Sequence, residues 1–245
     1  MLSKLKSFVY GFLLLHGLWF FGTLFVDERL IPSPMVVYAN MNLAFWADMT
    51  QHITHSLWRL LLAMAISILI GLIFGVLMAQ SKVVGKLLNP LIYFIYPIPK
   101  MAFLPVVMVL LGFGNPTIVT MIILIVVFQI VINVRDGINS IPEENYQTLL
   151  VLGANKWQLF KNVTFPAALS QILSSTRVAL GTATAILFIT ETSGYGLGHF
   201  IMTASNTLNY VNMFSGIVVL SVLAFILFLI VDILDAVFLR WKGSK

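Results

Sequence analysis

The sequence predicts an all-α integral membrane protein with six transmembrane helices and both termini in the cytoplasm. Of its 245 residues, 60% are hydrophobic and only 9% are charged, whereas about a quarter of an ordinary soluble domain is charged. Several apolar runs reach the roughly 20 residues that an α-helix needs to cross a bilayer. The chain contains no cysteine, which excludes disulfides, thiolate catalysis and cysteine metal sites.

Six segments are apolar and long enough to be membrane helices. The first follows Lys4 and Lys6 as a signal peptide would, but it is long for a signal core and no small-x-small cleavage pattern follows, so we expect a retained helix. Three prolines and a lysine interrupt the third, and small polar residues with Arg177 dilute the fifth. The segments are 8–26, 57–79, about 90–111, 117–134, about 173–190 and 213–239.

The basic residues set the orientation. Eleven of the fourteen lysines and arginines lie in segments that share the side of the N-terminus, which places both termini in the cytoplasm. Arg29 lies in an outer loop, and Arg59 and Lys100 lie within helices. The net charge of +5 is therefore explained by topology, and we expect no nucleic-acid partner. The eleven are Lys4, Lys6, Lys82, Lys86, Arg135, Lys156, Lys161, Arg177, Arg240, Lys242 and Lys245.

We expect one transmembrane domain with a long cytoplasmic loop. Residues 1–55 form the first helix and an outer loop, and residues 240–245 form a basic cytoplasmic tail. Residues 56–239 form a core of five helices, and the loop between the fourth and fifth predicted helices, residues 136–171, contains two short helices.

This long loop has recognisable helix boundaries. Pro142 and the two glutamates after it suit a helix N-terminus, and Gly153 suits a C-terminal stop. Trp157 and Phe160 then lie on one face of a second amphipathic turn, which Pro166 ends before the fifth membrane helix. The loop is either a connector resting on the membrane surface or a docking element with an aromatic side chain for a soluble partner.

One charge falls near the middle of the predicted third helix. Lys100 follows the Pro97–Pro99 break, and a broken helix at this depth is tolerated only against protein or a watery cavity. Ionisable residues inside the membrane are costly and often functional. Lys100 either attracts an anionic substrate in a translocation pathway, or extends to the membrane surface or pairs with a carboxylate.

Other charges suggest structural ion pairs. Arg59 and Glu191 lie near the outer ends of the second and fifth helices, where we favour a structural pair, with Glu191 also a candidate for the pathway. On the inner side, Arg177 lies at a depth similar to Asp232 and Asp235, and we expect a clasp between two helices.

Two smaller patterns, one of glycines and one of histidines, could indicate helix packing and a metal site. Gly71 and Gly75 form a G-x-x-x-G pattern that permits close helix packing, either inside the chain or at a dimer interface. His52 and His55 lie three residues apart but have no third ligand near them, so we predict no metal site.

The chain from Gln147 to Pro166 carries a spacing that resembles a known signature. Nine residues separate Gly153 from Val163-Thr164-Phe165-Pro166. The inner-membrane permease subunits of binding-protein-dependent ABC importers carry E-A-A, three residues, G, nine residues and I-x-L-P in a cytoplasmic loop. Gln147-Thr148-Leu149 stands where this family has E-A-A.

The resemblance extends over most of residues 56–198. The segments "SLWRLLLAMAISILIGLIFGVLMAQS", "YPIPKMAFLPVVMVLLGFGN" and "FPAALSQILSSTRVALG", and Glu191 followed by "GYGLG", resemble the nitrate/sulfonate/taurine-type group of these permeases. The resemblance implies a multi-pass protein of the bacterial inner membrane that pairs with a second copy of itself. It also implies a cytoplasmic ATPase dimer bound beneath it and an extracytoplasmic binding protein that delivers a small solute.

Within this resemblance, the long loop is the coupling element that seats in a groove of the ATPase. The substrate would pass along the dimer interface, lined mainly by the third to fifth helices. The coupling residues would be Gln147, Gly153, Ala154, Lys156, Trp157, Phe160 and Pro166, and the pathway residues Pro97, Pro99, Lys100 and Glu191.

The sequence itself supports this division of labour. Its Gly85-Lys86 pair has Gln80 where a phosphate-binding G-x-x-x-x-G-K-[ST] loop needs the first glycine, and Leu87 follows the lysine. We therefore expect no enzyme activity and no cofactor in this chain, with ATP and Mg bound by partner subunits.

Two other classes of protein are weaker fits. An autonomous secondary transporter or channel is the main alternative, but the sequence has no detectable repeats and it has a docking-type loop. A membrane-embedded enzyme would need a convergent set of His, Asp or Glu, which is missing. The substrate stays open among small oxyanions, sulfonates, thiamine-precursor pyrimidines, riboflavin and other solutes, and only Lys100 favours an anion.

Overall fold

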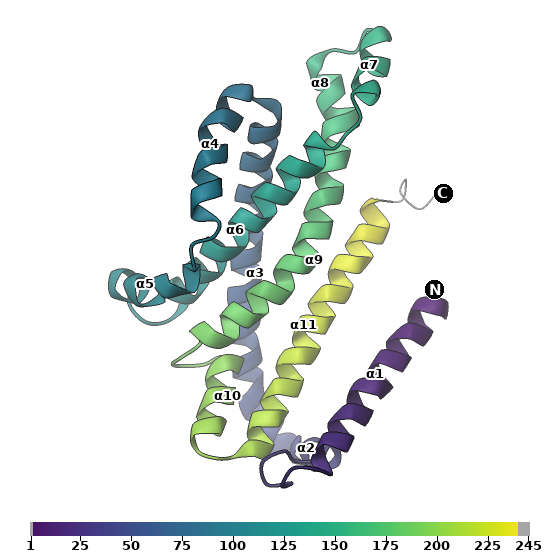
Figure 1. Ribbon diagram of the computed structural model, residues 1–245. Coiled ribbons are helices and arrows are strands. Elements are labelled where there is room, and N and C mark those ends of the chain that lie inside the picture. Colours follow the sequence, from purple (N-terminus) through teal and green to yellow (C-terminus); the bar gives the residue numbers. More distant parts are fainter. Residues whose placement is uncertain (1, 240–245) are drawn as a thin grey trace. The chain divides into compact units, whose positions relative to one another are not determined.

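The computed structural model describes the backbone of residues 2–239 and the side chains of residues 9–239, and this part of the chain contains helices and no strand (Figure 1). The predicted basic tail, 240–245, lies outside the described residues. The α-helices are α1 (Leu2–Thr23), α2 (Pro34–Asn40), α3 (Leu43–Gln80), α4 (Lys82–Ile95), α5 (Leu104–Leu111), α6 (Asn115–Asn139), α7 (Glu143–Val151), α8 (Lys156–Leu159), α9 (Phe165–Thr190), α10 (Leu197–Asn206) and α11 (Tyr210–Phe238). A 3₁₀ turn, η1 (Lys100–Phe103), precedes α5, and a π-helical turn, η2 (Phe160–Thr164), precedes α9.

Four helical runs in the described part of the chain are long and apolar enough to cross a membrane. They are α3, α6, α11 and the continuous run Lys156–Thr190, and α4 with Lys100–Leu111 makes a fifth if this bent pair is one span. The apolar part of α1 with described side chains, Val9–Thr23, is shorter. The prediction of an all-helical membrane protein is confirmed at this level, while the count of six and the orientation stay predictions.

The second predicted span begins earlier than expected, at Leu43 rather than Leu57. Asn42 starts the helix, because its side-chain Oδ1 accepts a hydrogen bond from the Phe45 N–H at 3.1 Å. Polar residues between 50 and 56 lower the hydropathy of the first turns and hide them from a search for apolar runs. These residues are nevertheless helical, and two of them, His52 and Ser56, are buried.

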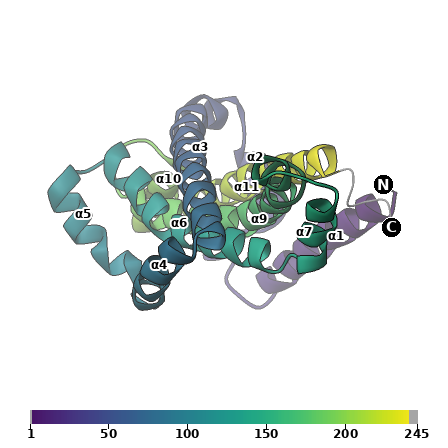
Figure 2. The same cartoon turned by 90° about the horizontal axis from the view of Figure 1, so that it is seen from above.

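The third predicted span is broken. Pro97 and Pro99 remove two backbone N–H donors, and the chain bends by 82° between α4 and the Lys100–Leu111 helix (Figure 2). The segment is therefore two short helices joined by a turn, where a single interrupted helix was expected.

The described chain forms two compact units, which we treat separately. One comprises Met1–Ser56 and Glu191–Val222, and the other comprises Leu57–Thr190 and Leu223–Lys245. In the larger unit, α6 and α9 lie side by side (Figure 1). Their contact is close at Gly137 of α6, where a Cβ would overlap the side chain of Gln171 on α9.

The G-x-x-x-G pattern of α3 packs within this larger unit. A Cβ on Gly71 would lie 2.8 Å from the Cβ of Ile130 on α6, and one on Gly75 would lie 2.7 Å from the Cβ of Val134. Both distances are shorter than real Cβ contacts. The two glycines therefore let α3 approach α6 inside one chain, which answers the question that the sequence left open.

Helix α4 folds back against this pair through a small apolar core. Met78 near the end of α3, Ile92 of α4 and Val131 of α6 are buried together. The side chain of Ser81 starts α4 by accepting a hydrogen bond from the Val84 N–H at 3.3 Å. Packing and capping together fix the direction in which α4 leaves α3.

A charged clasp joins α9 to the second half of α11. One guanidinium nitrogen of Arg177 is paired with Asp232 Oδ1 and lies 3.9 Å from Asp235 Oδ2. The guanidinium also lies over the ring of Phe228, 5.5 Å from its centroid. The two aspartates lie three residues apart on one helix face, so a single arginine lies near both.

In the smaller unit, aromatic and amide contacts join α1, α2 and the first half of α11. Trp19 of α1 stacks on Phe214 of α11, with ring centroids 5.7 Å apart. Asn40 donates to Asn212 Oδ1 at 2.7 Å. Burial raises the pKa of Tyr38, and its hydroxyl is hydrogen-bonded to Nε2 of His16.

A first prediction concerns the close approach of α3 to α6. Gly71→Ala should lower the thermal unfolding midpoint of the purified protein, because overpacking a tight contact costs about 1–3 kcal/mol. Gly181→Ala is the matched control, since a Cβ there meets nothing within 4 Å. If Gly71→Ala left the midpoint unchanged and instead dissociated a dimer, the glycines would serve an intermolecular interface.

A second prediction concerns the clasp. Arg177→Asp and Asp232→Arg should each lower the yield of folded protein, because each places two like charges opposite one another. The double variant should recover much of that yield, as measured by size-exclusion chromatography in detergent. Asp235→Asn should have the smaller effect, since this carboxylate lies farther from the arginine. Absence of recovery in the double variant would contradict a direct pairing.

Candidate functional site

The residues predicted for coupling gather at one end of the α6–α9 pair (Figure 1). Helix α7 ends where predicted: Gly153 has φ +82°, which favours glycine. Its N–H donates to the Leu150 carbonyl at 2.9 Å, and the next N–H, of Ala154, donates to the Leu149 carbonyl at 3.0 Å. These bonds satisfy the last carbonyls of α7 and turn the chain sharply toward α8.

Helix α8 begins with a reciprocal cap. The Asn155 side chain accepts from the Gln158 N–H at 2.9 Å, and the Gln158 side chain accepts from the Asn155 N–H at 2.7 Å. Trp157 stacks on Phe160 with ring centroids 5.6 Å apart. The turn between the two helices is therefore fixed at both of its ends by hydrogen bonds.

Pro166 does not end the second short helix, which differs from the sequence-based prediction. Helix α8 continues through the π-helical turn Phe160–Thr164 into α9, and the run from Lys156 to Thr190 is continuous. A π-helical turn shifts the hydrogen-bond pattern just before the proline, which has no N–H to donate. The tip is thus a direct extension of α9.

The segment from Glu143 to Leu159, which we call the α7–α8 tip, exposes apolar side chains. Leu150, Val151, Leu152 and Trp157 are exposed by 52%, 88%, 76% and 67%. The side chains of its polar residues, including Gln147 and Lys156, are exposed around them. At its base, the Tyr146 hydroxyl lies 3.2 Å from the Thr164 hydroxyl, which ties α7 to the start of α9.

Lys100 is hydrogen-bonded to backbone carbonyls at the break after α4. Its ammonium donates to the carbonyls of Ile95 and Tyr96, at 3.2 and 3.0 Å. It also lies 5.4 Å from the ring centroid of Tyr96 and 5.2 Å from that of Phe128. Lys100 thus caps the C-terminus of α4 next to Pro97 and Pro99.

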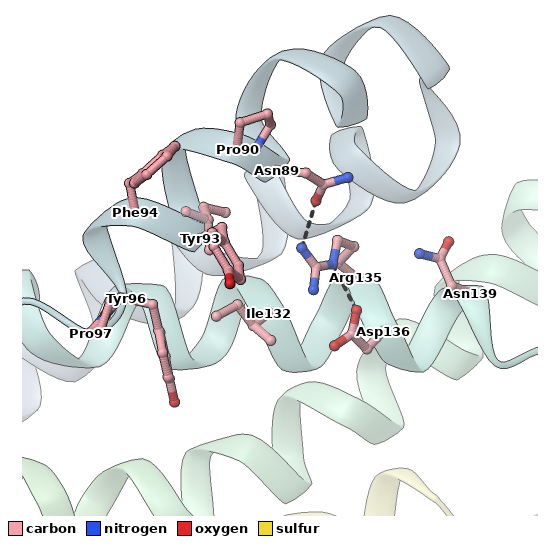
Figure 3. Close-up of a pocket in the computed structure, with 11 residues that line it drawn as sticks. Asn89, Pro90, Tyr93, Phe94, Tyr96, Pro97, Ile132, Arg135, Asp136 and Asn139 are labelled. Atoms are coloured by element: carbon pink, nitrogen blue, oxygen red, sulfur yellow. Dashed lines mark hydrogen bonds and ion pairs between the residues drawn. The ribbon is translucent and has the colours of Figure 1, made fainter.

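A pocket of about 1080 Å³ lies between α4 and the end of α6 (Figure 3). Arg135 lies in it with a side chain that is 19% exposed; its Nε donates to Asp136 Oδ1 at 2.7 Å and its Nη1 to Asn89 Oδ1 at 2.6 Å. Figure 3 shows the rings of Tyr93 and Tyr96 extending from the other side. The full lining is Asn89, Pro90, Ile92, Tyr93, Phe94, Tyr96, Pro97, Ile132, Arg135, Asp136 and Asn139.

Sequence reasoning missed this pocket, apart from Pro97. The polar residues that line the pocket are of types common on protein surfaces, so their types did not single them out in the sequence. The predicted third span began at about residue 90, which placed Asn89 outside it. A signal was present: Asn89, Tyr93 and Tyr96 are spaced four and three residues apart, so they share one face of α4.

Glu191 lies in the smaller unit and is fully buried. Its carboxylate accepts from the Ser56 hydroxyl at 2.8 Å and from the Gly198 N–H at 2.8 Å, and the same hydroxyl accepts from the Leu197 N–H at 2.8 Å. A Cβ on Gly196 would overlap this carboxylate. Glu191 therefore holds the glycine-rich segment before α10 against α3.

The predicted pairing of Arg59 with Glu191 joins residues of different units and stays a prediction. Arg59 is buried in the larger unit, where its Nε donates to Asn115 Oδ1 at 2.7 Å. Within the larger unit, the predicted site residues fall into separate groups: the α7–α8 tip, the α4 break, the Arg177–Asp232 clasp and the surroundings of Arg59, whereas Glu191 belongs to the smaller unit.

Comparisons with known proteins find related transport permeases and a solved structure with the same fold. The chain is 29% identical over 200 residues to the taurine transport system permease protein TauC of Escherichia coli, covering 81% of this chain and 73% of that protein. It is 26% identical over 238 residues to the formylaminopyrimidine transport permease protein ThiX of Halalkalibacterium halodurans, covering 96% and 95%. The inward-facing MetNI methionine ABC transporter has a chain with the same fold, at TM-score 0.70 and 18% identity, covering 81% of this chain and 99% of that one.

A family model described as the binding-protein-dependent transport system inner membrane component matches residues 67–242. The match spans α6, the α7–α8 tip and α9, and it confirms the resemblance noted in the sequence. The chain belongs to the family of binding-protein-dependent transport system inner membrane components.

Proposed function

We propose that this chain is the permease subunit of an ATP-driven importer, with six membrane spans and both termini in the cytoplasm. It pairs with a second copy of itself and forms the pathway for a small solute that an extracytoplasmic binding protein delivers. Separate ATPase subunits bind ATP and Mg and drive transport. The relatives named as transport permeases support this function, and the α7–α8 tip carries the argument for ATP-driven coupling.

The surface of the tip suits a soluble protein partner better than a bilayer. Contiguous exposed apolar residues mark interaction surfaces, and here Val151 and Trp157 are among the more exposed large side chains. Glu143 and Glu144 begin α7, and Lys156 begins α8. Apolar side chains with a polar and charged rim are typical of protein interfaces. Burial in lipid would instead place these charges in an apolar environment, which is energetically costly.

The construction of the tip suits the transmission of movement. The tip continues directly into α9, and Tyr146 and Thr164 join α7 to this continuation. A force on the tip therefore reaches a membrane helix without an intervening flexible loop. Movement of helix bundles as rigid bodies is a common way to couple two sites.

A third prediction tests the turn of the tip. Gly153→Val should lower substrate-stimulated ATP hydrolysis by the reconstituted complex several-fold, because a left-handed conformation costs a side-chain-bearing residue roughly 1–2 kcal/mol. Gly153→Asn should keep most of the activity, since asparagine tolerates that conformation.

Gly17→Val is the matched control for general effects, because a Cβ on Gly17 in α1 meets nothing within 4 Å. Equal loss in Gly17→Val, or full activity in Gly153→Val, would argue against a role of the turn in coupling. Solute uptake into proteoliposomes that lack any ATPase would contradict the importer function itself.

A further inference from the structure

We propose that the pocket between α4 and the end of α6 binds a membrane phospholipid whose headgroup carries both a phosphate and a primary ammonium, as phosphatidylethanolamine does. The phosphate lies beside Arg135, the ammonium beside Asp136, and an acyl chain along the deeper part of α4. This inference goes beyond the proposed transport function, because it requires only that the chain spans a membrane.

The polar end of the pocket lies at the depth of lipid headgroups. Arg135 is the first charged residue of α6, and it follows Asn115, where the helix begins, by about twenty residues. At 1.5 Å per residue this is about 30 Å, which matches the thickness of the hydrocarbon core of a bilayer. Arg135 donates to the side chain of Asn89 at 2.6 Å, so the polar end of the pocket on α4 lies at the same depth.

The rest of the pocket extends from this end toward the membrane interior. Helix α4 continues from Asn89 to Tyr96, about 10 Å farther along its axis, and Ile132 lies one turn deeper than Arg135 on α6. The lining of this deeper part is mostly carbon, because Ile92, Phe94, Pro97 and Ile132 belong to it. A pocket that is polar at headgroup depth and apolar below it has the polarity of an amphiphile.

The two charged residues of the lining form a pair that matches a zwitterion. Arg135 Nε donates to Asp136 Oδ1 at 2.7 Å, but its Nη2 bonds no described residue and can donate to a phosphate oxygen. Asp136 Oδ2 likewise bonds no described residue and can accept from an ammonium, which has three donors. The phosphate and the ammonium of the headgroup are joined by two carbons, so a cation and an anion in contact can bind both.

A headgroup with a negative charge alone gains less from this pair. The Arg135 guanidinium is already neutralised by Asp136, and an added anion would face that carboxylate with no cation of its own. Lys86 lies one turn before Asn89 on α4, but it is exposed and absent from the pocket lining. The charge balance inside the pocket therefore favours a zwitterionic lipid over an anionic one.

Exposed side chains of α4 beside the deeper part suit an acyl chain. Leu91 and Phe94 lie three residues apart on one helix face and are exposed by 52% and 72%. Figure 3 shows Phe94 directed away from α6, whereas the ring of Tyr93 extends toward it. The Tyr93 hydroxyl bonds no described residue, and a tyrosine at this depth commonly lies at the level of the headgroups.

The first test is the lipid selectivity of the permease, purified with its partner subunits. Native mass spectrometry counts the lipids retained after exchange into detergent that contains equal amounts of dioleoyl phosphatidylethanolamine, phosphatidylcholine and phosphatidylglycerol. We expect several-fold greater retention of phosphatidylethanolamine, because the ammonium of phosphatidylcholine has no N–H to donate and phosphatidylglycerol has no ammonium. Equal retention of the three lipids, or a preference for phosphatidylglycerol, would overturn the proposal.

The second test changes the charge pair. Asp136→Asn should abolish the preference for phosphatidylethanolamine over phosphatidylcholine and raise the retention of phosphatidylglycerol, because Arg135 is then a cation without a charged partner. Asp48→Asn is the matched control, since its carboxylate side chain is similarly exposed, at 64% against 57% for Asp136. An unchanged preference in folded Asp136→Asn protein, checked by its thermal unfolding midpoint, would argue against the pair as the headgroup site.

The third test locates the lipid without any substitution. Phosphatidylethanolamine with a diazirine in its acyl chain, photolysed in liposomes that contain the assembled complex, should label residues 91–97 and the segment around Ile132. Excess soluble O-phosphoethanolamine should not reduce the labelling, because it has no acyl chain. Loss of labelling with this competitor would make the pocket a solute site. Labelling confined to other segments, as expected if a second copy of the chain covers this side of α4, would also contradict the proposal.

Discussion

The close approach of α3 to α6 sets the position of the other functional elements in the larger unit. Gly71 and Gly75 remove the side chains that would separate the two helices, and α6 then lies against α9, with Gly137 facing Gln171. In lipid, apolar surface gives no drive for helices to associate, so close backbone contact between small residues has to supply it. The pocket lies on one side of α6, and the α7–α8 tip lies at the end of the α6–α9 pair.

Local hydrogen bonds then determine the geometry of the α7–α8 tip and of the α4 break. The left-handed Gly153 and the reciprocal Asn155–Gln158 cap define the turn of the tip. At the α4 break, Lys100 provides the donors that satisfy the last carbonyls of α4. Both places combine a sharp change of chain direction with satisfied backbone groups, which is the condition for irregular structure within or beside a membrane.

The sequence was informative where a single residue determines the backbone, and less so where packing does. Gly153 identified the end of α7, because few residues adopt its conformation. Pro166 was misleading, since a π-helical turn lets α8 continue into α9. Hydropathy missed the start of α3, where His52 and Ser56 are buried by contacts with the distant segment around Gly196. The spacing of Asn89, Tyr93 and Tyr96 indicated the face of α4 that lines the pocket, but no local pattern shows that this face meets Arg135, which lies far along the chain on α6.

The most direct test of the account is the accessibility of the α7–α8 tip when the ATPase subunits bind. Because the chain has no cysteine, Val151→Cys carries one thiol at a position that is 88% exposed, and Leu208→Cys, at 70% exposed, is the matched position in the other unit. Labelling by a membrane-impermeant maleimide in detergent solution should slow several-fold at residue 151 when the ATPase subunits are added, and should not change at residue 208. An unchanged rate at residue 151 in an assembled complex would contradict the assignment of the tip as the coupling element.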